Sequence, residues 1–358
     1  MKLDDPCMAN LPRATRNYIL GHYVASLVQG ETILSGSIRS RTMRHYVNDA
    51  LALFRLRKVR YSGLDITDYI WPIITALKKY EDVPNRRHMI SDSMRHHLQR
   101  QAAISAPDSE AAAVHDWVCV GSHNGARRKE FCQRSQTKYD VVEDAPGQPA
   151  AAFIRSDFTF LNAHERRLDD DELTEDSVAA IRFKWRFQKN RDNGEEKDFA
   201  RDDVNPNFCC CRASLRIYKR AVRHNVPAGI PIGIFVKKGK WRFLTADIVA
   251  KHLRLAARAT MNVTCETELR RWSTHSVRVT AANLLHRANM SDSFIKSRLR
   301  WKSDTFLMYL RNTIYAARQH TAALTISESN LPPVDERVYR EPEAHEIVVA
   351  AAAAAVVA

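Results

Sequence analysis

Apolar residues recur at intervals of three and four along the first third of the chain. Between residues 41 and 105 they form three successive stripes, which predicts three amphipathic helices. The inward positions are Met43, Tyr46, Val47, Ala50, Leu51 and Phe54, then Ile70, Ile73, Ile74 and Leu77, then Ile90, Met94 and Leu98. The third helix should cover residues 91–101. We therefore expect a helical domain over residues 41–105, preceded by an extension over residues 1–40.

The segment after the third stripe is small, polar and interrupted by a proline. It has the sequence AISAPDSEAAA and contains Pro107, a composition typical of a boundary between domains. We place this boundary at residues 103–112, so that a second domain covers residues 112–325. The tail over residues 326–358 is charged at first and then becomes a run of Ala and Val without an amphipathic pattern.

The second domain begins with the period of a strand and ends with the period of helices. Within residues 178–187, apolar and basic residues alternate strictly from Ile181 to Phe187, which predicts a half-buried strand. Its inward positions are Ile181, Phe183, Trp185 and Phe187. Asn193-Gly194 indicates a tight turn after this strand, and Gly239 indicates a second hairpin. Thr245 is a suitable N-cap for a helical region over residues 245–325. The predicted fold is mainly α with a small antiparallel β-sheet (α+β).

Composition adds a strong positive charge to this picture. The chain has 358 residues, of which 45% are apolar, and 55 Lys and Arg against 41 Asp and Glu give a formal charge of +14. Such a protein is a candidate polyanion binder, although a ribosomal or membrane-surface protein would also fit. The excess is concentrated over residues 270–311, where nine Lys or Arg face two acids.

Cysteine usage and hydropathy bear on the compartment. The seven cysteines are an odd number without regular spacing, which does not suit a disulfide framework. A zinc site at Cys209-Cys210-Cys211 would need a second ligand pair, for which only scattered residues such as His224 and His252 are available. We expect buried reduced thiols. Reduced thiols indicate a reducing, intracellular compartment. The sequence shows neither a membrane-spanning stretch nor the apolar core of a signal peptide.

Four residues in the basic region have chemistry that suits a phosphodiester. His275 and Arg278 are three positions apart and so share a helical face. Trp301 follows Arg278 by 23 positions, and Tyr309 follows Trp301 by 8. A guanidinium donates to two phosphate oxygens, an indole N–H donates to one, and an activated tyrosine can be a nucleophile. Each residue alone is more often a surface or core residue, so the suggestion of a site comes from their order.

This order resembles the tyrosine recombinase (phage integrase-like) family, whose members cut DNA through a covalent 3′-phosphotyrosine. The resemblance extends from about residue 41 to about residue 320. It includes Asn124-Gly125-Ala126-Arg127-Arg128-Lys129-Glu130, which is similar to the family's first arginine motif, and Lys189 at the predicted strand end. The runs STHSVR and LRWKSDTFLMYLRNT look most like the eukaryotic mobile-element branch that includes the Cryptons.

The resemblance implies that the second domain is the catalytic domain and that it contains a set of phosphate-binding residues. Arg127 and Arg278 would bind the scissile phosphate, and Glu130 would orient the site. Trp301 takes the place of a second histidine that many members have. The helical domain over residues 41–105 would be the family's core-binding (SAM-like) DNA-binding domain.

The resemblance also implies the nucleophile and the proton-transfer groups. Tyr309 would attack the phosphorus, Lys189 would protonate the leaving 5′ oxygen, and His275 would assist proton transfer. Tyr309 lies one position closer to Trp301 than the common family spacing, so Tyr315 stays an alternative nucleophile. Lys197, across the turn at residues 193–194, stays an alternative to Lys189.

What the family implies for the whole protein is site-specific recombination without metal, ATP or another cofactor. Consistent with this, the sequence has no P-loop and no carboxylate cluster of the metal-nuclease type. The expected partners are double-stranded DNA and further copies of the chain, as a homotetramer on two DNA sites, and no membrane. The expected location is the nucleus in a eukaryote and otherwise the cytoplasm with the nucleoid. Two alternatives stay open: a domesticated DNA-binding relic that does not cut, and a type IB topoisomerase.

Overall fold

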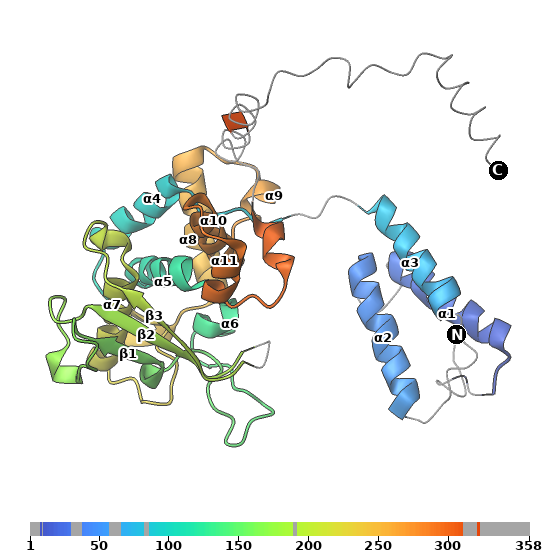
Figure 1. The fold of residues 1–358 in the computed structure, drawn as a ribbon, viewed down its shortest axis with the longest axis horizontal. Helices are drawn as coiled ribbons and strands as arrows, with labels where there is room; N and C mark the ends of the chain where they lie inside the picture. The colour runs from blue at the N-terminus through green and yellow to red at the C-terminus, as the bar shows by residue number, and fades with distance from the viewer. Residues whose placement is uncertain are drawn as a thin grey trace, which may run out of the picture. The chain divides into compact units, whose positions relative to one another are not determined.

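Two separate hydrophobic cores divide the computed structural model into two units, Met1–Asn85 and Arg86–Ala358. The chain is mainly α-helical with small antiparallel sheets (Figure 1), which confirms the predicted fold class. None of the described helices is long and apolar enough to cross a membrane. The structure describes residues 8, 10–29, 38–56, 66–81, 86–188, 192–310 and 321–322.

The described part of the first unit is a small helical assembly. Its helices are α1 (Arg13–Gln29), α2 (Ser40–Leu56) and α3 (Trp71–Leu77), with a π-helical turn at Ile66–Ile70 and a 3₁₀ turn at Lys78–Tyr80. The stripes predicted for α2 and α3 are buried as expected, at Met43, Val47, Leu51, Phe54, Ile70 and Ile74. Leu20, Val24 and Leu27 of α1 pack into the same core. The segment expected as an extension therefore contributes a helix to this unit.

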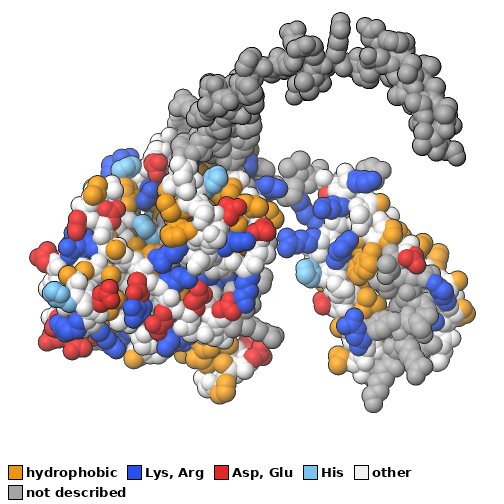
Figure 2. All heavy atoms as spheres, in the orientation of Figure 1, with side chains coloured by type: hydrophobic (Ala, Val, Ile, Leu, Met, Phe, Trp, Pro, Cys, Tyr) orange, Lys and Arg blue, Asp and Glu red, His pale blue; other side chains and the backbone are white. Residues whose placement is uncertain are grey.

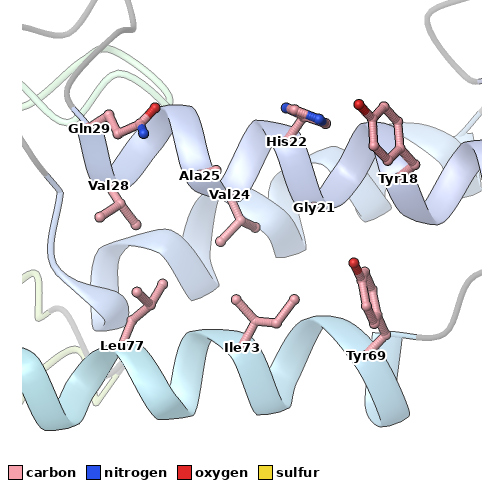
Figure 3. Close-up of a pocket in the computed structure, with 10 residues that line it drawn as sticks. All are labelled: Tyr18, Gly21, His22, Val24, Ala25, Val28, Gln29, Tyr69, Ile73 and Leu77. Atoms are coloured by element: carbon pink, nitrogen blue, oxygen red, sulfur yellow. The ribbon is translucent and has the colours of Figure 1, made fainter.

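An apolar groove of about 360 Å³ lies between α1 and α3. Figure 3 shows Val24 and Val28 of α1 on one side, with Ile73 and Leu77 of α3 opposite. These aliphatic side chains line the groove because the two helices do not pack fully against each other along this face.

The second unit contains the remaining described helices. They are α4 (Asp92–Ala103), α5 (Glu110–Asn124), α6 (Arg128–Phe131), α7 (Cys210–Arg223), α8 (Ala246–Met261), α9 (Glu266–Leu269), α10 (Thr274–Arg287) and α11 (Asp292–Leu299). Short 3₁₀ turns lie at Arg155–Asp157, Asp170–Glu172, Pro206–Phe208 and Asp304–Tyr309. Thr245 caps α8 as predicted, and Ser91 caps α4, since each side-chain oxygen accepts a backbone N–H three residues ahead.

Helix α4 belongs to the second unit, whereas the sequence placed it in the first domain. The predicted stripe Ile90, Met94 and Leu98 is buried, but it packs in the larger core, where α4 contacts α5 and α8. The division between the units therefore lies between Asn85 and Arg86 instead of within residues 103–112. Pro107 lies in the short link between α4 and α5.

Two antiparallel sheets accompany these helices. The first has the order β1 (Phe158–Leu161), β2 (Ala180–Trp185), β3 (Glu195–Ala200), and the second pairs β4 (Ile234–Lys237) with β5 (Lys240–Phe243). The alternation predicted for β2 is confirmed, because Ile181, Phe183 and Trp185 are buried. Phe187 lies beyond the end of the strand and is only partly buried. The predicted hairpin at Gly239 is also present, with Lys238 and Gly239 as its turn.

Helix α5 is the centre of the second unit (Figure 1). It contacts α4, α7, α8 and α10, so its side chains are buried nearly all round. Its Trp117 stacks on Phe131 and Phe153, at ring-centroid distances of 5.3 and 6.3 Å. Those two aromatic residues follow α5 in the chain, so this stacking holds the segment after α5 close to the helix.

The consecutive cysteines of α7 and its N-cap are buried, as the sequence suggested. Cys209, Cys210 and Cys211 are nearly inaccessible and form no disulfide. Burial raises the pKa of the Cys211 thiol to about 12, so this thiol is protonated at neutral pH. Among the residues that the structure describes, no group of three or more His, Cys, Asp or Glu could hold a metal ion.

Replacing Gly121 with alanine should destabilise the protein. Gly→Ala within a helix usually stabilises by about 0.5–1 kcal/mol, but a Cβ here would collide with Val277 Cγ1 of α10. We expect the free energy of unfolding in urea to fall by about 1–3 kcal/mol, as in other overpacked cores. Gly229→Ala, where a Cβ meets open space, is the control and should change it by less than about 0.5 kcal/mol. Equal effects of the two substitutions would contradict this packing.

Candidate active site

The end of α5 presents Arg127 to the site. Gly125 ends the helix with φ 64°, a left-handed conformation that glycine adopts without strain. Arg127 then becomes the N-cap of α6 with extended backbone, and its N–H donates to Glu130 Oε2 at 2.9 Å. The spacing Gly-x-Arg-x-x-Glu is thus explained locally, because glycine allows the turn and the glutamate caps the short helix that follows.

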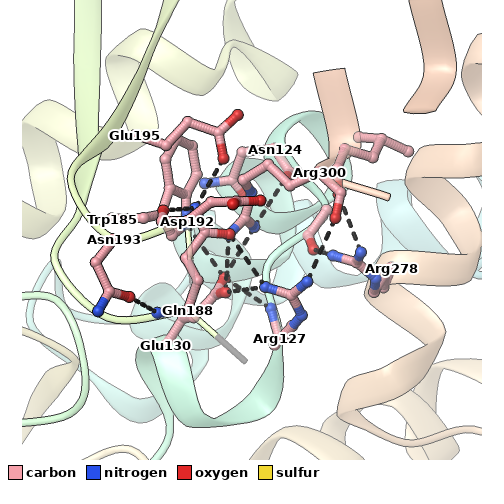
Figure 4. Close-up of polar contacts among 12 residues, drawn as sticks. Asn124, Arg127, Glu130, Trp185, Gln188, Asp192, Asn193, Glu195, Arg278 and Arg300 are labelled. Carbon is pink, nitrogen blue, oxygen red and sulfur yellow. Dashed lines mark hydrogen bonds and ion pairs between the residues drawn. The ribbon is translucent and has the colours of Figure 1, made fainter. Parts of the chain in front are cut away.

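Glu130 is a buried carboxylate shared by two arginines. Arg300 donates to both its oxygens, at 2.9 and 3.0 Å, and Arg127 Nη1 donates to Oε1 at 3.2 Å. Trp185 Nε1 of β2 adds a contact of 3.4 Å (Figure 4). Burial alone would raise the pKa of Glu130, but the charges and hydrogen bonds of Arg300 and Arg127 outweigh it and lower the pKa to about 2. Glu130 is therefore ionised at every physiological pH.

Arg278 lies on α10, one turn after His275, with only 3% of its surface exposed. Its Nη2 donates to Leu299 O at 2.9 Å, and its Nη1 donates to Gly125 O. Its guanidinium carbon lies 4.1 Å from the centre of the Trp301 ring. A guanidinium has five N–H donors, so these contacts orient Arg278 and leave donors for an anion.

Positive charge exceeds negative charge inside this cluster. Among the described residues, Arg127, Arg278 and Arg300 surround one buried carboxylate, Glu130. The carboxylates of Asp192 and Glu195, also drawn in Figure 4, pair with Lys302 and Lys197. Burial, followed by repulsion from Arg127 and Arg300, lowers the pKa of Arg278 to about 9. In contrast, Lys and Arg are interspersed with Asp and Glu on the surface of the second unit drawn in Figure 2. The uncompensated charge is thus built into the site, and it favours a bound anion.

Tyr309 lies between His275 and Trp301. Its ring centroid is 5.1 Å from that of His275 and 5.0 Å from that of Trp301. Asn283 Nδ2 donates to Tyr309 O at 2.8 Å, which ties the tyrosine's backbone to α10. The buried Phe306 anchors the same turn in a small core with residues of α10 and α11. Tyr309 therefore has a defined place beside the arginine cluster.

His275 and Trp301 differ in what they can offer a reacting group. Burial, followed by repulsion from Arg278 and Arg87, lowers the pKa of His275 to about 4. His275 is therefore neutral at pH 7 and can accept a proton. Trp301 Nε1 is buried and has no hydrogen-bond partner within the described part of the chain, so it is a candidate donor to an anion.

The segment carrying Tyr309 is a 3₁₀ helix, Asp304–Tyr309, where the sequence suggested an amphipathic α-helix. Ser303 occupies the N-cap position, but its side chain makes no capping hydrogen bond. Leu307 is 46% exposed, whereas Phe306 and Tyr309, three positions apart, face the core, in agreement with the three-residue repeat of a 3₁₀ helix. Tyr315 lies outside the described residues.

The lysine predictions concern the turn between β2 and β3. Lys189 lies outside the described residues. Lys197 lies on β3 opposite Phe183, is 15% exposed and pairs with Glu195 at 3.0 Å. Gln188, the residue before Lys189, has its Oε1 at 3.4 Å from Nη1 of both Arg127 and Arg300. The chain therefore enters the turn beside the arginine cluster.

The structure thus brings together six of the seven residues predicted from sequence. They are Arg127, Glu130, His275, Arg278, Trp301 and Tyr309. It adds Arg300, Trp185 and Gln188, which the sequence analysis did not select for the site. The sequence feature that could have identified Arg300 is its place directly before Trp301. Nothing in the sequence distinguished it from the neighbouring basic residues Lys296 and Arg298.

Comparison with known proteins adds the following. No protein-family model and no curated protein matches the chain. Among solved structures, a lambda integrase dimer bound to a COC′ core site is 13% identical, with a TM-score of 0.42 over 87% of this chain and 83% of that chain. The Tn1549 transposon integrase in complex with circular intermediate DNA is 12% identical, with a TM-score of 0.37 over 88% and 98%. Values in this range do not establish a common origin or activity.

The lowered pKa of His275 predicts a loss of stability in acid. The unfolded chain binds a proton near pH 6.5, whereas folded His275 binds one only near pH 4. The loss in the free energy of unfolding that His275 causes is therefore absent above about pH 6.5 and grows as the pH falls. It is complete below about pH 4, where it reaches on the order of 3 kcal/mol. His275→Gln should flatten this part of the unfolding free energy against pH. The exposed His164 provides the control, and an equal effect of His164→Gln would contradict the prediction.

Proposed function

We propose that this chain is a tyrosine recombinase that breaks and rejoins DNA through a covalent 3′-phosphotyrosine. The observation that supports this most is the placement of Tyr309 between His275 and Trp301, beside Arg278 and the two arginines that share Glu130. A tyrosine next to a buried excess of guanidinium groups suits attack on a phosphodiester. The order of the same residues along the sequence points to the same chemistry.

Each group has a role in the proposed reaction. The Tyr309 oxygen attacks phosphorus, a new O–P bond forms, and the bond from phosphorus to the 5′ oxygen breaks. Arg127 and Arg278 donate to the non-bridging oxygens and stabilise the charge that develops on them. Neutral His275 accepts a proton during the exchange, and Lys189 protonates the 5′ oxygen that leaves.

The energetics of this exchange explain why it would proceed without ATP. The phosphotyrosine is itself a phosphodiester, so one such bond replaces another and the free energy is conserved for rejoining. Electrostatic stabilisation by preorganised donors is the main contribution that the protein makes. In this proposal the arginines supply that stabilisation.

The wider setting is part of the same proposal. Double-stranded DNA is the substrate, and recombination of two sites calls for several copies of the chain, which we propose form a homotetramer. The first unit, with its helices α1 to α3, would bind DNA in addition to the second unit, which carries the proposed active site. Kinship with eukaryotic mobile elements such as the Cryptons would place the protein in a nucleus.

Trapping the covalent intermediate tests the chemistry directly. Incubation with nicked duplex DNA from the sequences that flank the coding region should give a protein–DNA adduct that survives denaturation. Tyr309→Phe should abolish the adduct, because phenylalanine lacks the attacking oxygen. Tyr139→Phe, at an exposed tyrosine of the same unit, should leave the adduct unchanged.

The other outcomes of this experiment are also informative. An adduct that persists in Tyr309→Phe and disappears in Tyr315→Phe would transfer the nucleophile to Tyr315. Salt-sensitive DNA binding without any adduct on the flanking sequences would favour a relic that binds DNA and does not cut it.

A second experiment separates a recombinase from a type IB topoisomerase. A recombinase requires defined sites and partner subunits, so it should leave a supercoiled plasmid of arbitrary sequence unrelaxed. The same plasmid carrying two copies of the flanking sequence should yield recombined products, detected by the change in fragment sizes. Relaxation of the arbitrary plasmid by a monomer, at a rate independent of these sites, would favour the topoisomerase.

A further inference from the structure

Arg300 has an unusual backbone conformation. It is the C-cap of α11, with φ 60° and ψ 52° in the left-handed region. A residue with a side chain is strained there, whereas glycine is not. A strained backbone conformation persists when the surrounding contacts compensate for the strain. We therefore expect the side chain of Arg300 to make contacts that glycine could not make.

The contacts of the Arg300 side chain meet this expectation. The side chain is fully buried and bonds both oxygens of Glu130, at 2.9 and 3.0 Å. Its guanidinium carbon lies 3.9 Å from the ring centre of Trp185, and its Nη2 is 3.4 Å from Asn124 O. Figure 4 shows it beside Asn124, Trp185 and Glu130. Arg300 therefore connects the end of α11 with the end of α5, with α6 and with β2.

The backbone of the same turn holds the two arginines proposed to bind phosphate. Leu299 O accepts from Arg278 Nη2 at 2.9 Å, and Arg300 O accepts from Arg127 Nη2 at 3.4 Å. The ring of Trp301 lies against the guanidinium of Arg278. Residues 299–301 thus contact Arg127 and Arg278, the two proposed phosphate-binding arginines. The Arg300 side chain connects this turn to the rest of the unit.

We infer that Arg300 is a positioning residue that neutralises Glu130 and thereby leaves Arg127 available to a DNA phosphate. The Arg300 side chain is inaccessible and bonds both carboxylate oxygens, whereas the guanidinium of Arg127 contacts Glu130 with one nitrogen, at 3.2 Å, and its side chain is 25% exposed. A buried carboxylate that loses its main counter-ion is strongly unfavourable. Without Arg300, the nearest cation is Arg127, whose guanidinium would then close onto Glu130 and be lost to the phosphate.

This inference rests on the proposed function, because it assigns to Arg127 a phosphate as its partner. It differs from a purely structural role in one respect. A structural ion pair would change only the stability of the fold, whereas here the contribution of Arg127 to DNA affinity depends on whether Arg300 is present.

A double-mutant cycle on DNA affinity tests the dependence. The full chain carrying Tyr309→Phe, which cannot cleave, is titrated with a 30-base-pair duplex of the flanking sequence at several salt concentrations. Arg127→Gln should weaken binding about tenfold, as expected for a charged hydrogen bond, and reduce the salt slope by about 0.9, as expected for one phosphate contact. In a chain that also carries Arg300→Gly, Arg127→Gln should have almost no further effect on either quantity.

The choice of glycine at position 300 preserves the turn. Glycine adopts φ 60° without strain. In the Arg300→Gly variant the backbone carbonyls of positions 299 and 300 can therefore still accept from Arg278 and Arg127. A second background, Arg300→Gly with Glu130→Gln, removes both charges of the pair. With Glu130 neutralised by substitution, Arg127 should again contribute about tenfold to affinity, and this rescue distinguishes neutralisation from general damage to the fold.

The remaining outcomes overturn the inference in distinguishable ways. If Arg127→Gln weakens binding by the same factor with and without Arg300, Arg127 does not depend on Arg300 and the inference is wrong, while the proposed function stands. If the second background shows no rescue, neutralisation of Glu130 is not the role of Arg300. If the parent chain shows no salt-dependent binding to DNA, the proposed function fails and the inference fails with it.

Discussion

The interaction on which the site depends is the burial of one carboxylate, Glu130, among arginines. A buried charge must be paired and hydrogen-bonded to be tolerated, and the groups that satisfy Glu130 come from distant parts of the chain. Arg127 comes from the turn between α5 and α6, Trp185 from β2 and Arg300 from the end of α11. The carboxylate therefore ties the ends of α5 and α11 to β2. The stacking of Trp117 on Phe131 and Phe153 also holds the segment after α5 in place.

Local patterns predicted most of the elements of this fold. The alternation in β2, the cap Thr245 and the hairpin at Gly239 depend on neighbouring residues alone, and each is present. The position of α4 could not be predicted in the same way. An amphipathic stripe shows that one face of a helix is buried, but it does not show which core covers that face. The 3₁₀ geometry before Tyr309 was missed for a similar reason, because the packing of Phe306 decides which face turns inward.

The candidate site shows the same division between local and distant causes. Arg278 was predicted because its residue type and its spacing from His275 suit a phosphate, whereas Arg127 and Glu130 were predicted from the resemblance of their motif to that of the tyrosine recombinases. The structure places the three together. Arg300 was not predicted, because its importance depends on a left-handed backbone and on a carboxylate 170 residues earlier in the sequence. Lys189 stays a prediction, although the end of β2 approaches the arginines through Gln188.

The excess of positive charge also links the phosphate-binding groups to the proton-transfer group. Repulsion from Arg278, after burial, keeps His275 unprotonated at neutral pH, while the guanidiniums themselves keep their charge because their ordinary pKa is so high. One electrostatic field thus yields two kinds of residue, cations that bind an anion and a neutral base beside them. Mutual repulsion within the cluster destabilises the unliganded site, and a bound phosphate relieves it, so the folded protein should be most stable when the site is filled.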